Sequence, residues 1–249
     1  MKSTYGVILA AGKGTRLNSN LPKVLHLIHN KPMVHHVIES CQTANITDIC
    51  LVVGYKKEDV LDHCKNFQTH YCIQKEQLGT GHAVICALDN IKTSSCNQVI
   101  ILAGDCPLIK PSTLSAFINH HETTNATATI LTGTLPNAEN YGRIIRDNNQ
   151  NIIGIQEAKD CTPEQLKINE FNSGIYCFNT PQLLESITKL QTNNTQNEYY
   201  LTDVIKILYN NGHTISGHCI DTVYEILGAN TQEELDKLNK QAEKLFSQD

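Results

Sequence analysis

The chain has 249 residues, of which 40% are hydrophobic, and its formal net charge at pH 7 is −5. This length suits one large α/β domain or a domain with a small satellite, and no apolar run approaches the roughly 20 residues of a membrane-spanning helix. The negative charge excludes a broad basic surface for nucleic acid, so any anion site must be local. The ten cysteines are scattered without a C-x-x-C pair, so their spacing indicates neither disulfides nor a metal site. The apolar stretch near the start lacks a cleavage site, so it does not indicate a signal peptide. We therefore expect a cytoplasmic protein with no nucleic-acid or membrane partner.

Apolar, β-branched runs alternate with helical patterns through the first half of the chain. The runs cover residues 4–10, 48–54 and 98–104, and the helical patterns cover 33–43, 57–65 and 80–90. Such runs are typical of strands buried on both faces of a parallel sheet. The alternation predicts a doubly wound, Rossmann-like α/β sheet, which binds ligands beyond the carboxyl ends of its strands.

Shorter strands begin at about residue 126 and predict a mixed extension of the sheet that closes over the site. These strands are expected at 126–134, 142–147, 151–158 and 171–179, and further helices at 199–211 and 231–247. No Ser/Gly/Pro-rich linker divides the chain, so we predict one domain with two lobes. An apolar face formed by Leu235, Leu238, Ala242 and Leu245 indicates that the last helix packs on the domain or, as the alternative, serves as a weak contact. The helical histidine pairs, at 35–36 and 120–121, are expected to be partly exposed and without a role.

A glycine-rich, basic loop follows the first strand, within residues 7–23. It is not a Walker A loop, because Gly14 follows Lys13 where Ser or Thr is required, and the third glycine of the dinucleotide fingerprint is missing. Small residues there still let backbone N–H groups surround a phosphate. Arg16 would add a planar fork of donors and Lys23 a point charge. A solvated turn explains Gly-Lys-Gly alone, but not the Arg and Pro-Lys that follow it.

The segment LAAGKGTRLNSNLPK resembles the signature of sugar-nucleotide pyrophosphorylases, in which G-x-G-T-R is followed by P-K. Within that family the chain is most similar to the uridyltransferase lobe of the bacterial bifunctional N-acetylglucosamine-1-phosphate uridyltransferases. The resemblance continues in order, over nearly the whole chain, through QKEQLGTGHA, LAGDCPLI, YGRI, IQEAKD, FNSGIY, NEYYLTD and GAN. It implies a fold of the nucleotide-diphospho-sugar transferase type. The implied nucleotidyltransferase domain covers 1–230, with a nucleotide lobe at about 1–110 and a small sugar-binding lobe at about 126–225, and a C-terminal helix follows at 231–249.

The resemblance also implies which residues bind the nucleotide, UTP. Gln74 and Gly79 match the groups that read uracil, since an amide side chain and a backbone group can pair with one edge of a pyrimidine. A cytosine would leave these groups unpaired, which makes such a site selective. Taken without the motif, Gln74 would be a surface residue at a strand end. The matched nucleotide-binding positions are Leu9, Ala10, Ala11, Gly12, Gly14, Thr15, Gln74, Gly79, Thr80 and Gly104.

Asp105 and Asn230 match the two protein ligands of a Mg²⁺ cofactor that phosphate oxygens and water complete. The residues alone leave helix capping open for both, because each precedes a plausible helix start. The implied sugar-binding positions are Thr80, Ala103, Gly142, Glu157, Asn172 and Asn230. Several relatives have an aromatic residue where this chain has Ala103, which leaves the acyl specificity open.

The implied reaction transfers uridylyl from UTP to N-acetylglucosamine 1-phosphate and releases pyrophosphate. Direct in-line displacement needs no protein nucleophile, and Arg16 and Lys23 would be the catalytic residues that stabilise charge with Mg²⁺. The alternatives are another sugar 1-phosphate such as glucose 1-phosphate, another nucleotide, or a non-catalytic protein that binds sugar nucleotides. In the bifunctional relatives, a second lobe built as a β-helix of hexapeptide repeats carries acetyl transfer and the trimer contacts. No hexapeptide periodicity is present in this sequence, so we expect no acetyl-CoA-dependent activity. We also expect a monomer or small homo-oligomer in place of a β-helix trimer.

Overall fold

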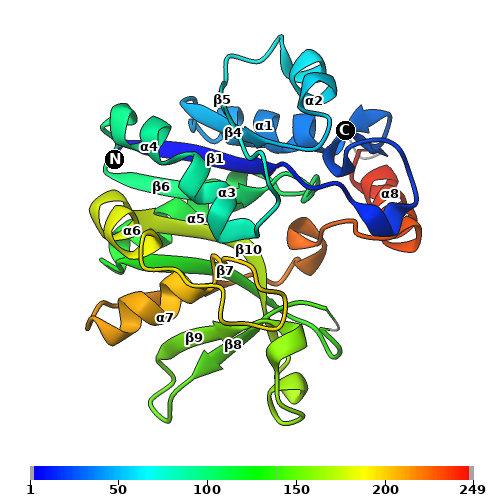
Figure 1. Ribbon diagram of the computed structural model, residues 1–249. Helices are drawn as coiled ribbons and strands as arrows, with labels where there is room; N and C mark the ends of the chain where they lie inside the picture. The colour runs from blue at the N-terminus through cyan, green and yellow to red at the C-terminus, as the bar shows by residue number, and fades with distance from the viewer. Residues whose placement is uncertain (1–2, 139, 247–249) are drawn as a thin grey trace.

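The computed structural model describes residues 3–138 and 140–246, and one mixed β-sheet lies at its centre (Figure 1). Within the described residues this sheet has nine strands. They are β1 (Thr4–Ala10), β4 (Ile49–Val53), β5 (His70–Ile73), β6 (Gln98–Ala103), β7 (Ala128–Thr134), β8 (Arg143–Arg146), β9 (Ile152–Gln156), β10 (Glu170–Asn179) and β11 (Ile215–Cys219). The short strands β2 (Leu27–Ile28) and β3 (Lys31–Pro32) pair with each other away from this sheet.

The main path through the sheet is β11-β7-β10-β6-β1-β4-β5. Strands β6, β1, β4 and β5 are parallel, so their carboxyl ends meet at one edge. Strand β10 runs antiparallel to both of its neighbours, β6 and β7, and β8 and β9 form a hairpin attached to β10. The sheet is therefore mixed, with a parallel half and an antiparallel half.

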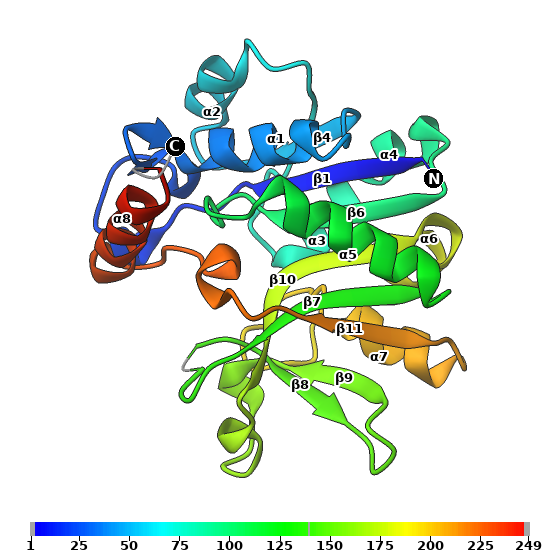
Figure 2. The ribbon, with the colours of Figure 1, turned by 180° about the vertical axis from the view of Figure 1, so that it is seen from behind.

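Helices cover both faces of the sheet, as the alternation of side chains along β1 requires. Ile8 and Ala10 pack with side chains of α1, α2 and α5, whereas Tyr5 and Val7 pack on the other face with side chains of α3, α4, α6 and α7. Figure 1 looks onto the second of these faces, and Figure 2 onto the first. The helices are α1 (Met33–Thr43), α2 (Lys57–Cys64), α3 (Thr80–Cys86), α4 (Leu88–Ser94), α5 (Pro111–Thr123), α6 (Thr180–Ile187), α7 (Asp203–Asn210) and α8 (Gln232–Phe246).

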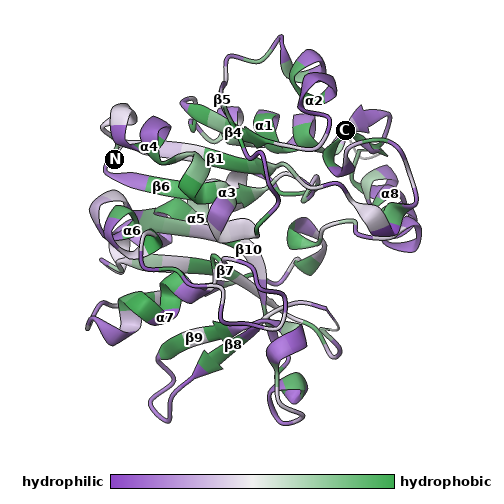
Figure 3. Cartoon of the chain, in the orientation of Figure 1, coloured by the Kyte–Doolittle hydropathy of each residue, from purple (hydrophilic) through white to green (hydrophobic). Residues whose placement is uncertain are grey.

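The parallel strands β1, β4 and β6 are largely buried on both faces, and every residue of β4 is buried. Figure 3 shows hydrophobic residues gathered in the central strands and largely hydrophilic connecting loops. Each aliphatic side chain that becomes fully buried contributes roughly 1.5–3 kcal/mol of hydrophobic free energy, so the parallel half is a firm support for the loops at its edge. None of the helices within 3–138 and 140–246 has the length and apolar character needed to cross a membrane.

The doubly wound α/β fold with a mixed extension is confirmed, and the predicted strands agree with the observed ones to within two residues. Two predicted helices differ from the observed ones. The pattern at 80–90 forms two helices that meet at Ala87, and the pattern at 199–211 becomes helical only from Asp203. The last predicted helix agrees with α8 where it is described, and its end at residues 247–249 lies outside the described residues. The patterns also do not predict β5, α6 and β11.

Two histidines expected at the surface are buried, so that expectation is wrong for His36 and His121. The ring of His36 is 8% exposed and donates from Nε2 to the carbonyl oxygen of Ile28, at 2.9 Å. His121 is 1% exposed and shares a hydrogen bond of 2.7 Å with the hydroxyl of Thr129. Both rings face neighbouring strands, which their position on a helix does not reveal. All ten cysteines lie in the described residues, and none of them forms a disulfide.

The last helix, α8, packs on the domain through the predicted face. Leu235, Leu238 and Ala242 are buried against Ile28 and Met33, with Leu245 partly buried beside them. A capping box starts the helix: the backbone N–H of Glu234 donates to the Thr231 hydroxyl, and the Glu234 carboxylate accepts from the backbone N–H of Thr231, both at 3.2 Å. Asn230 is therefore not the cap, and its side chain is free for other partners.

Candidate functional site

Two adjoining cavities lie beyond the carboxyl ends of β1, β5 and β6. The first, which we call the loop cavity, has a volume of about 300 Å³ and borders the segment after β1. The second, the β10 cavity, has a volume of about 370 Å³ and borders the antiparallel strands. Thr80, Ala103 and Asp105 line both cavities, so the two spaces share a border. This is the place where open α/β sheets bind their ligands.

The loop after β1 turns sharply at Gly14, whose φ of 70° lies in the left-handed region. A side chain at this position would place its Cβ 2.9 Å from the Cβ of Lys23, which is closer than such atoms approach. Leu17 and Val24, buried at either side, anchor the loop to the domain. Glycine at position 14 therefore lets the loop lie against Lys23 at the mouth of the site.

Lys23, Asp105 and Asn230 form a cation–oxygen cluster at the border of the two cavities. The ammonium of Lys23 forms an ion pair with Oδ2 of Asp105 and donates to Oδ1 of Asn230 at 2.7 Å. Arg16 also donates to Oδ1 of Asn230, at 3.2 Å. The Lys23 and Asp105 side chains are only 18% and 15% exposed, which strengthens their attraction. Since two oxygen donors from distant segments converge on one cation, the cluster suits a hard metal ion.

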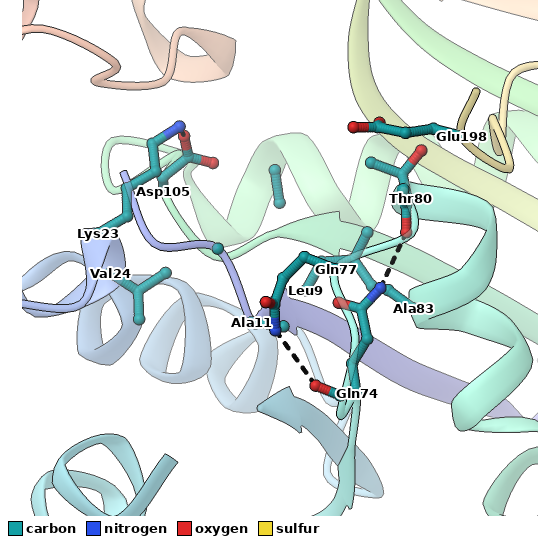
Figure 4. A pocket seen from close by; sticks show the side chains of 13 residues that line it. Leu9, Ala11, Lys23, Val24, Gln74, Gln77, Thr80, Ala83, Asp105 and Glu198 are labelled. Atoms are coloured by element: carbon teal, nitrogen blue, oxygen red, sulfur yellow. Dashed lines mark hydrogen bonds and ion pairs between the residues drawn. The ribbon is translucent and has the colours of Figure 1, made fainter. Parts of the chain in front are cut away.

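Helix capping does not explain Asp105, because the N-cap of the next helix, α5, is Lys110. Asp105 instead follows β6 directly, and Figure 4 shows its carboxylate beside the Lys23 ammonium on one side of the loop cavity. The role of Asp105 and Asn230 as metal ligands stays a prediction.

Gln74 is buried on the opposite side of the loop cavity, at the end of β5, and only 4% of it is exposed. The expectation from the residues alone, of a surface side chain, is therefore wrong. Its Nε2 donates to the carbonyl oxygen of Gly79 at 3.0 Å and lies 3.2 Å from Nδ1 of His82 (Figure 4 shows the first of these contacts). Gly79 has a φ of 104°, and a Cβ there would lie 2.6 Å from the carbonyl oxygen of Tyr199. Glycine is thus required where the turn after β5 meets the 198–199 segment.

The β10 cavity presents hydrogen-bonding side chains from the antiparallel half. Burial raises the pKa of the Glu157 carboxyl, and the nearby Asp160, Asp203 and Glu198 raise it further, although the Thr202 hydroxyl donates to it at 3.0 Å. Asn172 donates from Nδ2 to the Tyr176 hydroxyl at 2.7 Å. A shift of register in β10 between Asn172 and Tyr176 aims Asn172 at the cavity, as bulges beside binding sites often do.

Most of the predicted site residues line the two cavities. Those in the loop cavity are Leu9, Ala11, Gly12, Lys23, Gln74, Gly79, Thr80, Ala103 and Asp105; those in the β10 cavity include Arg16, Gly142, Glu157, Asn172 and Asn230. Ala10, Gly14, Thr15 and Gly104 are outside both linings. Ala10 packs into the core, and Gly104 donates its backbone N–H to the carbonyl oxygen of Leu9. The side-chain positions of these four residues border neither cavity, and Gly14 and Thr15 lie in the loop between the lining residues Gly12 and Arg16.

Several lining residues have no predicted role, although most lie inside a recognised motif. Gln77 and Glu198 line the loop cavity, while Tyr141, Gly228 and Glu234 line the β10 cavity. Four of these belong to QKEQLGTGHA, NEYYLTD, YGRI and GAN, so proximity to a matched residue is the signal that could have found them. Glu234 lies outside those motifs. It accepts the backbone N–H of Asn230 at 2.6 Å and so holds the segment that carries the Asn230 amide.

Comparison with known proteins agrees with the motifs. A family model described as nucleotidyl transferase matches residues 5–223. The bifunctional protein GlmU of Clostridium novyi (strain NT) is 46% identical over 229 residues, and that of Clostridium tetani (strain Massachusetts / E88) is 43% identical over the same length. Each match covers 92% of this chain and 50% of the relative. The chain thus spans about half the length of the curated relatives it matches.

A solved structure agrees with the fold. It is a Bacillus anthracis protein described as a glucose-1-phosphate thymidylyltransferase, crystallised with sucrose, and it matches with a TM-score of 0.76 over 96% of this chain and 95% of its own. At 20% identity this likeness shows the shared fold and no more. The family model spans most of the chain, and the chain belongs to the nucleotidyl transferase family.

Proposed function

We propose that this chain transfers uridylyl from UTP to N-acetylglucosamine 1-phosphate, giving UDP-N-acetylglucosamine and pyrophosphate. The observation that carries the proposal is the cluster of Lys23, Asp105 and Asn230 at the shared border of two cavities. The loop cavity has small residues and the cation Lys23, with Arg16 at its border, which suit a triphosphate, and the β10 cavity has the hydrogen-bonding groups that suit a sugar. A reaction that joins two substrates at one phosphate needs its charged groups at such a border.

The chemistry proposed is a single in-line displacement. A phosphate oxygen of the sugar 1-phosphate forms a bond to the α-phosphorus of UTP while the bond to pyrophosphate breaks, and no protein nucleophile takes part. Arg16 and Lys23 stabilise the negative charge on the phosphates, and the loop from Gly12 to Thr15 contributes backbone N–H groups. These groups are positioned by the buried end of β1, so little reorganisation is needed when the substrate binds.

Mg²⁺ is the proposed cofactor, held by Asp105 and Asn230. When bound, it would neutralise phosphate charge and polarise the P–O bonds. The donor set fits this ion, because a carboxylate and an amide oxygen converge on one cation. Lys23 contacts both of those oxygens now. Its ammonium would have to release them as the ion and the phosphates arrive, and would then be free to contact a phosphate oxygen.

The sugar is proposed to bind in the β10 cavity. Glu157 can accept hydrogen bonds from ring hydroxyls, and Asn172 can donate to or accept from hydroxyl or acetamido groups. Ala103 at the border leaves room beside the sugar and makes its identity the least defined part of the proposal.

A pyrophosphate-release assay tests the proposal. UTP, dTTP and CTP would each be paired with N-acetylglucosamine 1-phosphate and with glucose 1-phosphate, with Mg²⁺ present. The highest kcat/KM is expected for UTP with N-acetylglucosamine 1-phosphate. A higher kcat/KM for another pair of nucleotide and sugar 1-phosphate would mean that this pair is the substrate. Tight binding of UDP-N-acetylglucosamine without any pyrophosphate release would indicate a non-catalytic protein that binds sugar nucleotides.

A further inference from the structure

The orientation of the Gln74 amide is fixed by what surrounds it. The carbonyl oxygen of Gly79 can only accept a hydrogen bond, so the atom facing it at 3.0 Å must be the amide nitrogen. The amide oxygen therefore points to the other side of the group. Because Gln74 lines the loop cavity and is 4% exposed, this oxygen is an acceptor available at the cavity wall rather than in bulk water.

His82 supplies a second acceptor at the same nitrogen. Nε2 of Gln74 can only donate, so Nδ1 of His82, 3.2 Å away, must accept and carries no proton. The ring proton is then on Nε2, which lies 3.8 Å from the sulfur of Cys86 one helical turn along α3. Burial raises the pKa of the Cys86 thiol, so its sulfur is present as the thiol at neutral pH.

We infer that His82 is a positioning residue that sets the base selectivity of the site through Gln74. An amide nitrogen has two hydrogens, and Gly79 and His82 take one each. Turning the amide by 180° would put its oxygen against the carbonyl oxygen of Gly79 and, while the ring proton stays on Nε2, against Nδ1 of His82, so both hydrogen bonds would be lost. The cavity therefore offers an acceptor to the base, which suits the ring N–H of uracil or thymine and leaves the unprotonated ring nitrogen of cytosine without a donor. The inference rests on the proposed nucleotidyl transfer and concerns a residue that does not itself contact the substrate.

The test compares two substitutions of the same ring. His82→Phe keeps an aromatic ring on α3 but removes the acceptor, so only Gly79 opposes the turned amide. His82→Asn can place its amide oxygen near the position of Nδ1 and restore the acceptor. The readout is the ratio of kcat/KM for UTP to that for CTP in pyrophosphate release. We expect His82→Phe to lower this ratio about tenfold, the effect of losing one neutral hydrogen bond, and His82→Asn to stay within about threefold of the parent.

A matched control is His35→Phe, since His35 is a partly buried helical histidine that bonds the carbonyl oxygen of His63, away from both cavities. Its UTP to CTP ratio is expected to equal that of the parent. An unchanged ratio in His82→Phe, or an equal loss in both His82 variants, would overturn the inference. If the parent protein prefers dTTP to UTP, the proposed function fails, but the inference can still be tested with the ratio of kcat/KM for dTTP to that for CTP. A parent protein that uses no pyrimidine nucleotide would overturn both the proposed function and the inference.

A measurement without turnover checks the same geometry. Long-range ¹H–¹⁵N spectra of the free protein report which ring nitrogen of a histidine carries the proton, and the His82 signals are assigned by their absence from His82→Phe. We expect the proton on Nε2 at neutral pH. A proton on Nδ1 would contradict the inference.

Discussion

The parallel and antiparallel halves of the sheet meet their cavities in different ways. On the parallel side, the loop cavity is lined by small residues and by the cation Lys23, and Arg16 lies at the border with the β10 cavity, where it donates to Asn230. On the antiparallel side, the cavity is lined by longer polar side chains: Glu157, which follows β9, and Asn172 of β10. The difference separates two kinds of recognition: backbone groups and positive charge suit a triphosphate, whereas directional side chains suit the hydroxyls of a sugar.

The charges of the two halves reinforce this separation. Lys23 and Arg16 gather at Asn230, whereas Glu157 lies among acidic neighbours that raise its pKa. A phosphate near Glu157 would be repelled, and one near Lys23 would be attracted. The sugar phosphate is thus expected to bind with its phosphate at the border and its ring in the β10 cavity. The following substitutions test each half separately.

The largest effect is expected from Asp105→Asn on the parallel side. The substitution keeps the shape of the side chain but removes the charge that pairs with Lys23 and that a divalent ion needs. Turnover should fall about a thousandfold, the upper range for one charge-stabilising group, and the Mg²⁺ concentration for half activity should rise. Pyrophosphate release over a Mg²⁺ titration measures both, with the exposed Asp89→Asn as control. A variant with the parent's Mg²⁺ dependence would show that the metal binds elsewhere.

Lys23→Ala should affect turnover and metal binding in opposite directions. Turnover is expected to fall about a hundredfold, the scale of one contact worth about 3 kcal/mol in the transition state. Binding of Mn²⁺ to the free protein should become tighter, because the ammonium no longer occupies Asp105 and Asn230. Calorimetric titration measures that affinity, and Lys65→Ala, at an exposed ion pair on the surface, is the control. Weaker Mn²⁺ binding in the variant would contradict the shared position of ammonium and metal.

Glu157→Gln should make the protein more stable and less active. Because the folded state raises the pKa of this carboxyl, the proton is held more tightly in the fold than in the unfolded chain. Its contribution to stability is therefore fully present below its usual pKa near 4.5 and is lost as pH rises through the folded value. The Gln variant, which cannot ionise and can still accept from Thr202, should melt higher than the parent at pH 7.5 but not at pH 4.

The catalytic part of the same prediction concerns the sugar alone. Glu157→Gln should lower kcat/KM for the sugar phosphate about tenfold, as expected for one weakened hydrogen bond to a substrate hydroxyl, with the KM for UTP unchanged. Steady-state kinetics with each substrate varied in turn give both values. A rise in the KM for UTP of similar size would place Glu157 in the nucleotide half.

Local patterns in the sequence predict the parallel half well. Strands β1, β4 and β6 are continuous apolar runs, and some site residues come soon after a strand end, as Asp105 does after β6. The edge strands β5 and β11 escape prediction because they carry polar and exposed residues, such as His70 and His218, in place of an apolar run. The short α6 has only eight residues and no long periodicity to detect.

Contacts between distant segments account for what the sequence does not reveal. The burial of Gln74 depends on the turn at Gly79, which folds against Tyr199 from a late segment of the chain. Likewise Asn230 meets Arg16 and Lys23, from the opposite end of the chain, only because the fold brings these segments together. No periodicity encodes these encounters. A motif can show that such residues matter together, but the fold is needed to show which atoms meet.

The smallest effect is expected where the site adjoins a helix cap, and it separates two neighbouring residues. Thr231→Ala removes the N-cap hydroxyl of α8 and should cost about 1 kcal/mol of stability, or about 2–4 °C in Tm for a chain of this size. Activity should stay within about twofold, because Glu234 still accepts from the backbone N–H of Asn230. Asn230→Ala should do the reverse: the capping box survives, so Tm changes little, while turnover falls with the loss of the oxygen that receives Lys23 and Arg16. Thermal unfolding and pyrophosphate release on both variants provide the comparison. Equal losses of stability in the two would mean that Asn230 also helps to start the helix, and a silent Asn230→Ala would remove it from the site.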